Sequence, residues 1–191
     1  MQVLNYEEYT MNGKRIKKVK TAVLGCTGLV GQQFVRMLDL HPYFEVSILT
    51  ASKKSTGKKY IEAVNWALGG DIPLSMREIV LTETSVESIC AGGIDVVFSA
   101  VPAAVANKLE VILADKGLIV FSNAGANRMQ PDVPVVIPEV NPDHLELVIP
   151  RLKNEKGFIV TNSNCSTAGL VMTLCPLIEL GIKSVYVSTY Q

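Results

Sequence analysis

The sequence lacks long hydrophobic runs and any imbalance of charge. No apolar run approaches the roughly 20 residues that cross a bilayer, and the polar start of the chain lacks the apolar core of a signal peptide. The 18 basic residues equal the 18 acidic residues, so the formal net charge is zero. These absences argue against binding to nucleic acid or to membranes, and they predict a cytoplasmic protein.

Cysteine and histidine are also scarce. The four cysteines lie far apart without a CxxC pair, and there are only two histidines. Zinc sites need closely spaced ligands, and disulfides are rare in cytoplasmic chains of this size. We therefore predict neither a metal site nor a disulfide framework. The cysteines are Cys26, Cys90, Cys165 and Cys175.

Apolar segments alternate between β-type runs and runs at helical spacing over the first two thirds of the chain. This alternation predicts an α/β fold with a doubly wound, Rossmann-like parallel sheet. A polar, glycine-containing insert with the only tryptophan interrupts the pattern at residues 53–71. The expected strands are residues 17–23, 44–51, 78–82, 94–101, 118–122 and 158–161, and the expected helices are residues 28–40, 85–91 and 102–115.

The composition changes at residues 123–150, where five prolines predict a long ordered loop rather than a helix. We expect residues 1–16 to form a loose N-terminal extension and residues 17–160 to form the Rossmann-like domain. Residues 161–191 would begin an α+β catalytic and dimerisation domain, with a strand at residues 183–190.

That last expected strand runs directly up to Gln191. Domains rarely end on a strand that nothing covers, so we expect the chain to be the first part of a longer polypeptide. The alternative is a short protein whose last strand forms a sheet edge.

Three glycines lie between the first expected strand and the first expected helix. In a dinucleotide-binding loop, Gly25 would allow the tight turn, Gly28 the approach of a pyrophosphate, and Gly31 close packing of helix on strand. The phosphate would lie at the helix N-terminus. Glycines also simply turn chains, but the strand before and the helix after favour the binding loop.

The end of the second expected strand carries no acid to bind a ribose 2′-hydroxyl. Ser52, Lys53, Lys54 and Ser55 instead offer donors and positive charge for a 2′-phosphate. We therefore predict NADP rather than NAD as the cofactor. Individually, the two lysines are equally consistent with a solvated loop.

A second candidate contact follows a central strand, where Ser99-Ala100-Val101-Pro102 would leave room for the cofactor. Ligands of open α/β sheets bind outside the carboxyl ends of the strands. Without the glycine loop, this run would be an ordinary strand-to-helix turn.

Cys165 lies at another strand-to-helix turn, flanked by Asn164 and Ser166. The positive end of a helix dipole favours thiolate over thiol. With a nicotinamide cofactor, such a thiolate would attack an acyl carbonyl, and backbone N–H groups after Cys165, with Asn164, could hold the oxyanion. A buried structural cysteine is the alternative, but the polar flanks argue against it.

Arg128 lies in the loop after the fifth expected strand. An arginine there could bind a carboxylate or a phosphate with two hydrogen bonds. A salt bridge that holds the loop is equally consistent with its position.

Together these residues resemble the aspartate-semialdehyde dehydrogenase family. The resemblance covers residues 25–191, and Ser52-Lys-Lys-Ser55-x-Gly57 is most similar to the branch found in archaea and fungi. The last two matching motifs are specific, whereas the glycine loop is not. The motifs are Gly25-x-Thr-Gly28-x-Val-Gly31, Ser99-Ala-x-Pro102, Ser122-Asn-Ala…Arg128-Met, Asp132-Val-Pro-x-x-Ile-Pro-Glu-Val-Asn-Pro142 and Ser163-Asn-Cys-Ser-Thr167.

The resemblance implies NADP-dependent reductive dephosphorylation of L-aspartyl 4-phosphate to L-aspartate 4-semialdehyde, a step toward lysine, threonine, methionine and isoleucine. Cys165 matches the nucleophile that forms a thioacyl enzyme, Arg128 and Asn164 would bind the phosphate group, and Gln191 would help to bind substrate. The implied cofactor-binding residues are Gly25, Thr27, Gly28, Leu29, Val30, Gly31, Ser52, Ser55, Ser99, Ala100 and Pro102.

The family's chains are longer than this one. By resemblance, the acid–base histidine, an arginine for the substrate carboxylate and most of the dimer interface would come after Gln191, and neither His41 nor His144 matches the catalytic position. We therefore expect a homo-oligomer for the full-length protein and weak or no turnover from these 191 residues alone.

Two other functions stay open. Malonyl-CoA reductase resembles the same branch and uses the same thioester chemistry, although that family looks different around its cysteine. A dinucleotide-binding module without catalysis is the second, and it would have no need of an activated thiol at Cys165.

Overall fold

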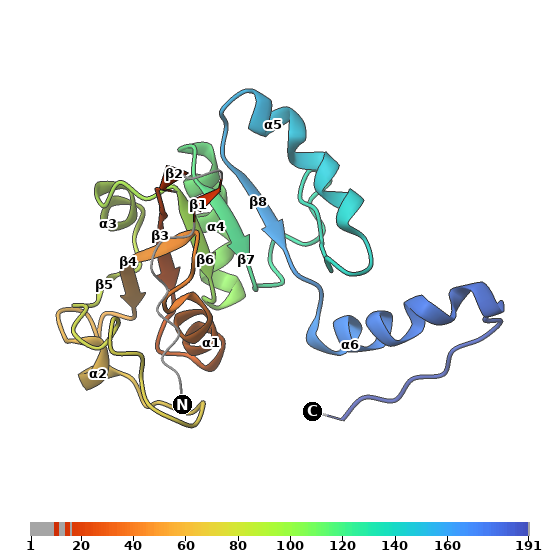
Figure 1. Cartoon of the computed structure of the whole chain (residues 1–191), viewed down its shortest axis with the longest axis horizontal. Helices are drawn as coiled ribbons and strands as arrows, with labels where there is room; N and C mark the ends of the chain where they lie inside the picture. The colour runs from red at the N-terminus through yellow and green to blue at the C-terminus, as the bar shows by residue number, and fades with distance from the viewer. Residues whose placement is uncertain (1–9, 12–13, 16, 191) are drawn as a thin grey trace.

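A six-stranded parallel sheet organises the chain (Figure 1). The computed structural model describes residues 10–11, 14–15 and 17–190. The strand order β5-β4-β3-β6-β7-β8 begins in the middle and winds outward both ways, which confirms the predicted doubly wound α/β fold. The strands are β1 (Thr10–Met11), β2 (Lys14–Arg15), β3 (Val19–Leu24), β4 (Phe44–Ala51), β5 (Thr82–Glu83), β6 (Val96–Ser99), β7 (Ile119–Ser122) and β8 (Phe158–Thr161).

Helices connect the parallel strands and cover the sheet. Among the described residues, none of them has the length and apolar character that a bilayer crossing requires. The helices are α1 (Leu29–Leu38), α2 (Tyr60–Ala63), α3 (Val86–Ala91), α4 (Ala103–Asp115), α5 (Ile149–Lys153) and α6 (Cys165–Leu174), with 3-10 helices η1 (Pro142–Val148) and η2 (Cys175–Leu180).

Side chains of β3 alternate between the two faces of the sheet, as the pleat requires. Ala22 and Leu24 pack with α3 and α4, while Val23 packs with α1 and the insert. Each of these three side chains is fully buried. Burial on both faces explains why the strand reads as a continuous apolar run.

The proline-rich segment differs from its prediction. The expected loop at residues 123–150 contains η1, which continues into α5. Pro142 and Pro150 occupy the first turns of these helices, where the missing N–H costs nothing and the fixed φ suits a helix. Val136 and Val148 of this segment pack with Phe158 and Val160 of β8.

The strand predicted at residues 183–190 is also wrong. These residues have no regular secondary structure and pair with no described strand. The expected strand at residues 78–82 is shorter and later, because only Thr82–Glu83 pairs with β4. Residues 10–11 and 14–15 of the expected loose extension form a short antiparallel pair.

Helix α6 extends away from the sheet, and the last described residues run back beside it (Figure 1). None of its residues is buried, which sets it apart from α1 and α4. The division of the chain at residue 160 remains a prediction, although β8 belongs to the same sheet as β3.

Candidate active site

The glycine loop joins β3 to α1 in a tight turn held by the neighbouring strand. The N–H groups of Gly25 and Cys26 both donate to the Thr50 carbonyl, each at 3.1 Å. Gly25 has a φ of +72°, and a Cβ there would lie 2.7 Å from the backbone oxygen of Ala100. Only glycine therefore fits this turn between β4 and β6.

The other two glycines face different surroundings. A Cβ on Gly31 would overlap the backbone oxygen of Gly25 and lie 2.7 Å from the Cα of Cys26. A Cβ on Gly28 would make only ordinary contact, 3.5 Å from the same oxygen. Gly31 therefore lets α1 pack against its own turn, whereas Gly28 leaves open space beside the first helical N–H groups.

A cleft of about 470 Å³ lies outside the carboxyl ends of β3, β4 and β6. Its lining is mainly apolar, with Val101 and Val105 among the apolar residues, and Thr27, Ser52 and Lys53 add polar groups. The lining residues are Gly25, Thr27, Gly28, Ala51, Ser52, Lys53, Glu83, Thr84, Ala100, Val101, Pro102 and Val105.

Two helix N-termini border this cleft. Helix α1 has Gly28 at its N-cap and α4 has Pro102, and neither cap side chain bonds to the helix. Neither first turn contains an acidic residue. The partial positive charge of each helix end is therefore left for an anion in the cleft, as suits the pyrophosphate of a dinucleotide. Ser99 Oγ is fully buried and has no hydrogen-bond partner among the described residues.

The structure brings six of the predicted cofactor residues into this cleft and leaves five outside its lining. Leu29 and Val30 lie exposed in the first turn of α1, and Ser55 lies in the turn after β4. Gly31 and Ser99 are buried behind the lining. The six in the lining are Gly25, Thr27, Gly28, Ser52, Ala100 and Pro102.

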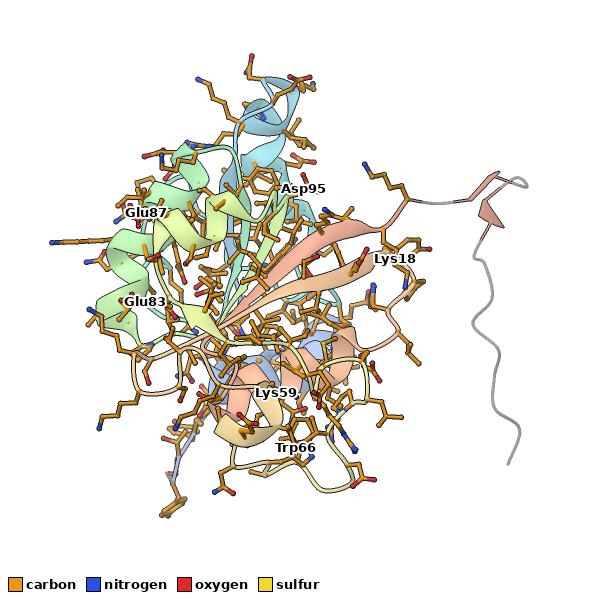
Figure 2. All side chains as sticks on the ribbon, turned by 90° about the vertical axis from the view of Figure 1, so that its left-hand side faces the viewer. Lys18, Lys59, Trp66, Glu83, Glu87 and Asp95 are labelled. Carbon is orange, nitrogen blue, oxygen red and sulfur yellow. The ribbon has the colours of Figure 1, made fainter. Side chains whose placement is uncertain are left out.

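The insert after β4 positions the glycine loop through the buried side chain of Gln32. Its Nε2 donates to the carbonyls of Thr27 and Asn65, each at 3.0 Å, and its Oε1 accepts from the Ala67 N–H at 2.8 Å. Figure 2 shows the insert beneath the sheet, with Lys59 and Trp66 labelled. One amide thus ties the loop to the insert.

Tyr60 makes the second tie between insert and loop. Its fully buried ring places the hydroxyl 3.1 Å from the Cys26 carbonyl, to which it donates. Burial raises the pKa of the Tyr60 hydroxyl and also raises the pKa of the Cys26 thiol, to about 12. Cys26 is therefore a packed, protonated side chain of the loop.

The carboxyl ends of β3, β6, β7 and β8 lie in one row. Ala100 N–H donates to Leu24, Asn123 N–H to Ser99, and Asn162 N–H to the Ser122 carbonyl, so the register continues past the strand ends. Three steps of about 4.8 Å put the ends of β3 and β8 about 14 Å apart. The cleft and the turn that precedes Cys165 therefore share one edge of the sheet.

Arg128 lies at the β7–β8 part of this edge. Its Nη2 donates to the Asn123 carbonyl at 3.2 Å and to Asn162 Oδ1 at 3.3 Å, while Asn162 Nδ2 also bonds to Asn123 Oδ1. Its Nε is buried without a partner among the described residues. An orphaned charged donor beside two strand ends suits an anionic ligand.

A buried carboxylate fixes the loop that carries Arg128. Glu110 of α4 is fully buried and accepts from Ser122 Oγ at 2.7 Å and from Asn127 Nδ2 at 2.8 Å. Asn127 directly precedes Arg128, so the start of the loop is anchored on α4. The salt bridge considered as an alternative role for Arg128 is absent from the described residues, where its partners are a carbonyl and an amide.

Cys165 is exposed and is the first residue of α6. Asn164 caps the helix, since its Oδ1 accepts from Ser166 N–H at 3.0 Å and Thr167 N–H at 3.4 Å. These are the N–H groups that the sequence suggested for an oxyanion, and here the cap occupies them. An oxyanion would need the amide of Asn164 to turn away or to donate through its nitrogen.

Gln191, predicted to bind substrate, lies outside the described residues. Sequence reasoning missed Glu83, Gln32 and Tyr60. Glu83 enters the cleft from a neighbouring strand, and Gln32 and Tyr60 act across more than 30 residues of chain. No local spacing signals such contacts; only the periodicity of α1, which puts Gln32 on its buried face, hinted at one of them.

Comparison with known proteins places these features in context. The family model for the semialdehyde dehydrogenase NAD-binding domain matches residues 20–148. An aspartate-semialdehyde dehydrogenase of Methanothermobacter thermautotrophicus is 52% identical over 176 residues, which are 91% of this chain and 50% of that protein. A malonyl-CoA reductase (NADP) of Metallosphaera sedula is 37% identical over 92% of this chain and 49% of its own length.

The fold is also similar to that of solved structures. The aspartate-semialdehyde dehydrogenase of Candida albicans, solved with NADP, has a TM-score of 0.79 and 43% identity, over 86% of this chain and 48% of that one. The chain thus spans about half the length of the relatives that it matches.

Proposed function

Because this chain belongs to the semialdehyde dehydrogenase family through its NAD-binding domain, we propose that it serves the NADP-dependent reductive dephosphorylation of L-aspartyl 4-phosphate to L-aspartate 4-semialdehyde. One observation carries the proposal: an exposed cysteine at a helix start, and an arginine Nε without a partner among the described residues, lie on the same sheet edge as a cleft bordered by two helix N-termini without side-chain caps. A cytoplasmic location and a homo-oligomeric full-length protein belong to the same proposal.

The residues of the cleft fit a dinucleotide. Gly28 and Pro102 present the free N–H groups of α1 and α4 to a pyrophosphate, and Ser52 and Lys53 offer donors to a 2′-phosphate. The relative from Candida albicans was solved with NADP, which supports the choice of this cofactor. When bound, the reduced cofactor supplies the hydride that takes the acyl group to the aldehyde.

Cys165 would act as the nucleophile. Its thiolate attacks the acyl carbon of the acyl phosphate, the carbon–oxygen bond to phosphate breaks, and inorganic phosphate leaves a thioester on the sulfur. Reduction of this thioester by hydride and a proton would then release the aldehyde and restore the thiol. Cys165 is the first residue of α6, so its sulfur lies near the positive end of the helix dipole.

Arg128 and Asn164 would hold the phosphate group. The buried Nε of Arg128 supplies a charged donor, and Asn162 fixes the guanidinium next to the strand that leads to Cys165. The Asn164 amide nitrogen can donate while its oxygen caps α6. Both side chains thus orient the leaving group. The role of Gln191 in substrate binding stays a prediction.

A CoA-thioester reductase is the second candidate, since the chain is 37% identical to a malonyl-CoA reductase (NADP). The chemistry at Cys165 would be the same, with a CoA thiolate as leaving group in place of phosphate. In that case Arg128 would have no phosphoryl group to bind at the acyl carbon.

Single-turnover acylation tests the proposal on this chain, because this step needs only the thiol and the anion site. The chain is mixed with aspartyl phosphate or with malonyl-CoA, and intact mass and released phosphate or CoA are measured. We expect an aspartyl adduct on Cys165, one phosphate for each adduct, and none in Cys165→Ser. Arg128→Lys should slow the step by about tenfold or more, because the guanidinium donates in a fixed fork.

The outcomes separate the candidates. A malonyl adduct with release of CoA and no aspartyl adduct would favour the CoA-thioester reductase. If neither acyl donor modifies Cys165 while NADPH still binds, the chain is a dinucleotide-binding module without catalysis.

A further inference from the structure

An acidic side chain enters the cofactor cleft from an unexpected strand. In nucleotide-binding sheets, an acid at the end of the second strand binds the ribose 2′-hydroxyl. Here that strand is β4, which ends at Ala51 without an acid. Parallel pairing puts Glu83 of β5 directly beside Ala51, and Glu83 lines the same cleft as Ser52.

The backbone around Glu83 is firmly held. Ser85 N–H and Ser88 Oγ donate to its carbonyl at 2.9 and 2.6 Å. Next to it, Thr84 Oγ1 donates to the Ala51 carbonyl at 3.2 Å and lies 2.8 Å from Thr50 Oγ1. These contacts join the ends of β4 and β5, so the backbone of Glu83 is fixed at the mouth of the cleft.

Lys53, one of the residues expected to bind a 2′-phosphate, pairs with this acid. The distance from Lys53 Nζ to Glu83 Oε1 is 3.4 Å, and the two side chains are 86% and 47% exposed. Ion pairs in such open positions contribute little net stability and are screened by salt. Lys53 can therefore leave Glu83 for a phosphate, and Glu83 can turn to other donors at little cost.

We propose that Glu83 is a specificity-determining residue that makes the ribose subsite accept both forms of the dinucleotide. The inference rests on the proposed function of the cleft. A 2′-phosphate carries a charge of about −1.5 to −2 and must take Lys53 from Glu83 against the repulsion of the carboxylate. An unphosphorylated ribose instead donates its hydroxyls to Glu83, which leaves Lys53 paired. The preference for NADPH over NADH is therefore small, about tenfold or less.

Binding titrations on the chain itself test this. NADPH and NADH are titrated by their fluorescence into the wild type, Glu83→Gln, Lys53→Met and Glu87→Gln, and thermal unfolding checks that each variant folds. Glu83→Gln should tighten NADPH and weaken NADH, so that the ratio of the two Kd values changes by about tenfold at low salt and less at high salt. Lys53→Met should weaken NADPH alone.

Glu87→Gln is the matched control, since Glu87 lies on the neighbouring α3, is exposed, and is not part of the cleft lining (Figure 2). It removes the same charge and should leave the ratio within about twofold. An unchanged ratio in Glu83→Gln, or an equal change in Glu87→Gln, would overturn this inference and leave the proposed function intact. If the wild type binds neither dinucleotide, the proposed function fails and the role of Glu83 with it.

Discussion

At the residue scale, two cysteines each lie between a strand and a helix but differ in their exposure to solvent. Cys26 follows β3 and is fully buried, and Cys165 follows β8 and is exposed. Burial raises the pKa of the Cys26 thiol to about 12, so this thiol stays protonated near neutral pH. Position at a helix start therefore does not by itself make a reactive thiol.

We expect iodoacetamide at pH 8 to alkylate Cys165 and to leave Cys26 unmodified until the chain unfolds. Burial keeps both the reagent and the charge away from Cys26. Peptide mass mapping after timed labelling would measure both rates, with Cys165→Ser as the control. Labelling of Cys26 as fast as that of Cys165 in the native chain would contradict the assignment.

His41 provides a pH-dependent contribution to stability. Its Nδ1 accepts from the N–H groups of Tyr43 and Phe44, each at 3.2 Å. Burial, and then the charge of Lys18, lower the pKa of His41 below its ordinary value of 6.5. The unfolded chain therefore binds a proton at His41 at a higher pH than the folded chain does. The unfolding free energy should fall as the pH drops from about 7.5 to about 5.5.

Denaturant titrations across this range check the sign. His41→Asn keeps an acceptor for the turn but has no proton to gain, so its unfolding free energy should vary less with pH. The carboxylates titrate mostly below this range. Equal pH slopes in wild type and variant would rule out His41 as the source.

At the scale of elements, substitutions of Gly28 and Gly31 should separate an effect on binding from an effect on folding. Gly31→Ala forces a methyl group onto the Gly25 carbonyl and should cost about 1–3 kcal/mol or more of unfolding free energy. Gly28→Ala meets only an ordinary contact, so it should melt near the wild type but bind NADPH at least about tenfold more weakly. Thermal melts and NADPH titrations measure both; equal melts for the two variants would contradict the packing role of Gly31.

Gln32 joins the insert to the glycine loop, so its loss should lower both the stability of the chain and its affinity for NADPH. Gln32→Met would leave Thr27, Asn65 and Ala67 without their partners and should cost about 1–3 kcal/mol of unfolding free energy. NADPH should also bind more weakly, because Thr27 lines the cleft. Gln33→Met is the control on the same helix, since it loses only the bond from Arg36. Equal NADPH affinities in the two variants would show that the tie does not position the loop.

Element positions followed from the sequence wherever periodicity and glycines agreed. β4 and β8 lie within the predicted bounds, because their apolar runs stop at polar turns. Pro142 and Pro150 misled the prediction, since proline ends helices in their interiors but begins them in the first turn. Residues 183–190 have the composition of a strand, but a strand needs a partner, and composition cannot supply one.

The site was predictable only where its parts are local. The turn around Gly25 and Gly28 and the capped start of α6 are each readable from a few consecutive residues. Glu83 could not be found in this way, because it reaches the cleft only through the register of β5 on β4. Pairing between strands is a property of the fold, so local spacing does not reveal it.

Burial is distributed unevenly over the whole molecule. The central strands β3 and β6 are packed on both faces, whereas α6 has no buried residue. The free energy of local unfolding is small where few apolar contacts hold a helix or strand in place. Amides of α6 should therefore exchange with deuterium at least about a hundredfold faster than those of β3.

Native-state exchange followed by mass spectrometry of peptides would measure this difference. The peptide of α4 is a suitable control, since it is a helix of similar length that packs against the sheet. Protection of α6 equal to that of α4 would mean that the helix is held by contacts other than those described.

The single tryptophan, Trp66, lies in the same insert that holds the glycine loop through Gln32, packed against the core beside α1. Its indole emission therefore comes from one known place in the chain. Because reduced nicotinamide absorbs where tryptophan emits, quenching of Trp66 and sensitised emission from the dinucleotide would report occupancy of the cleft optically, without a label.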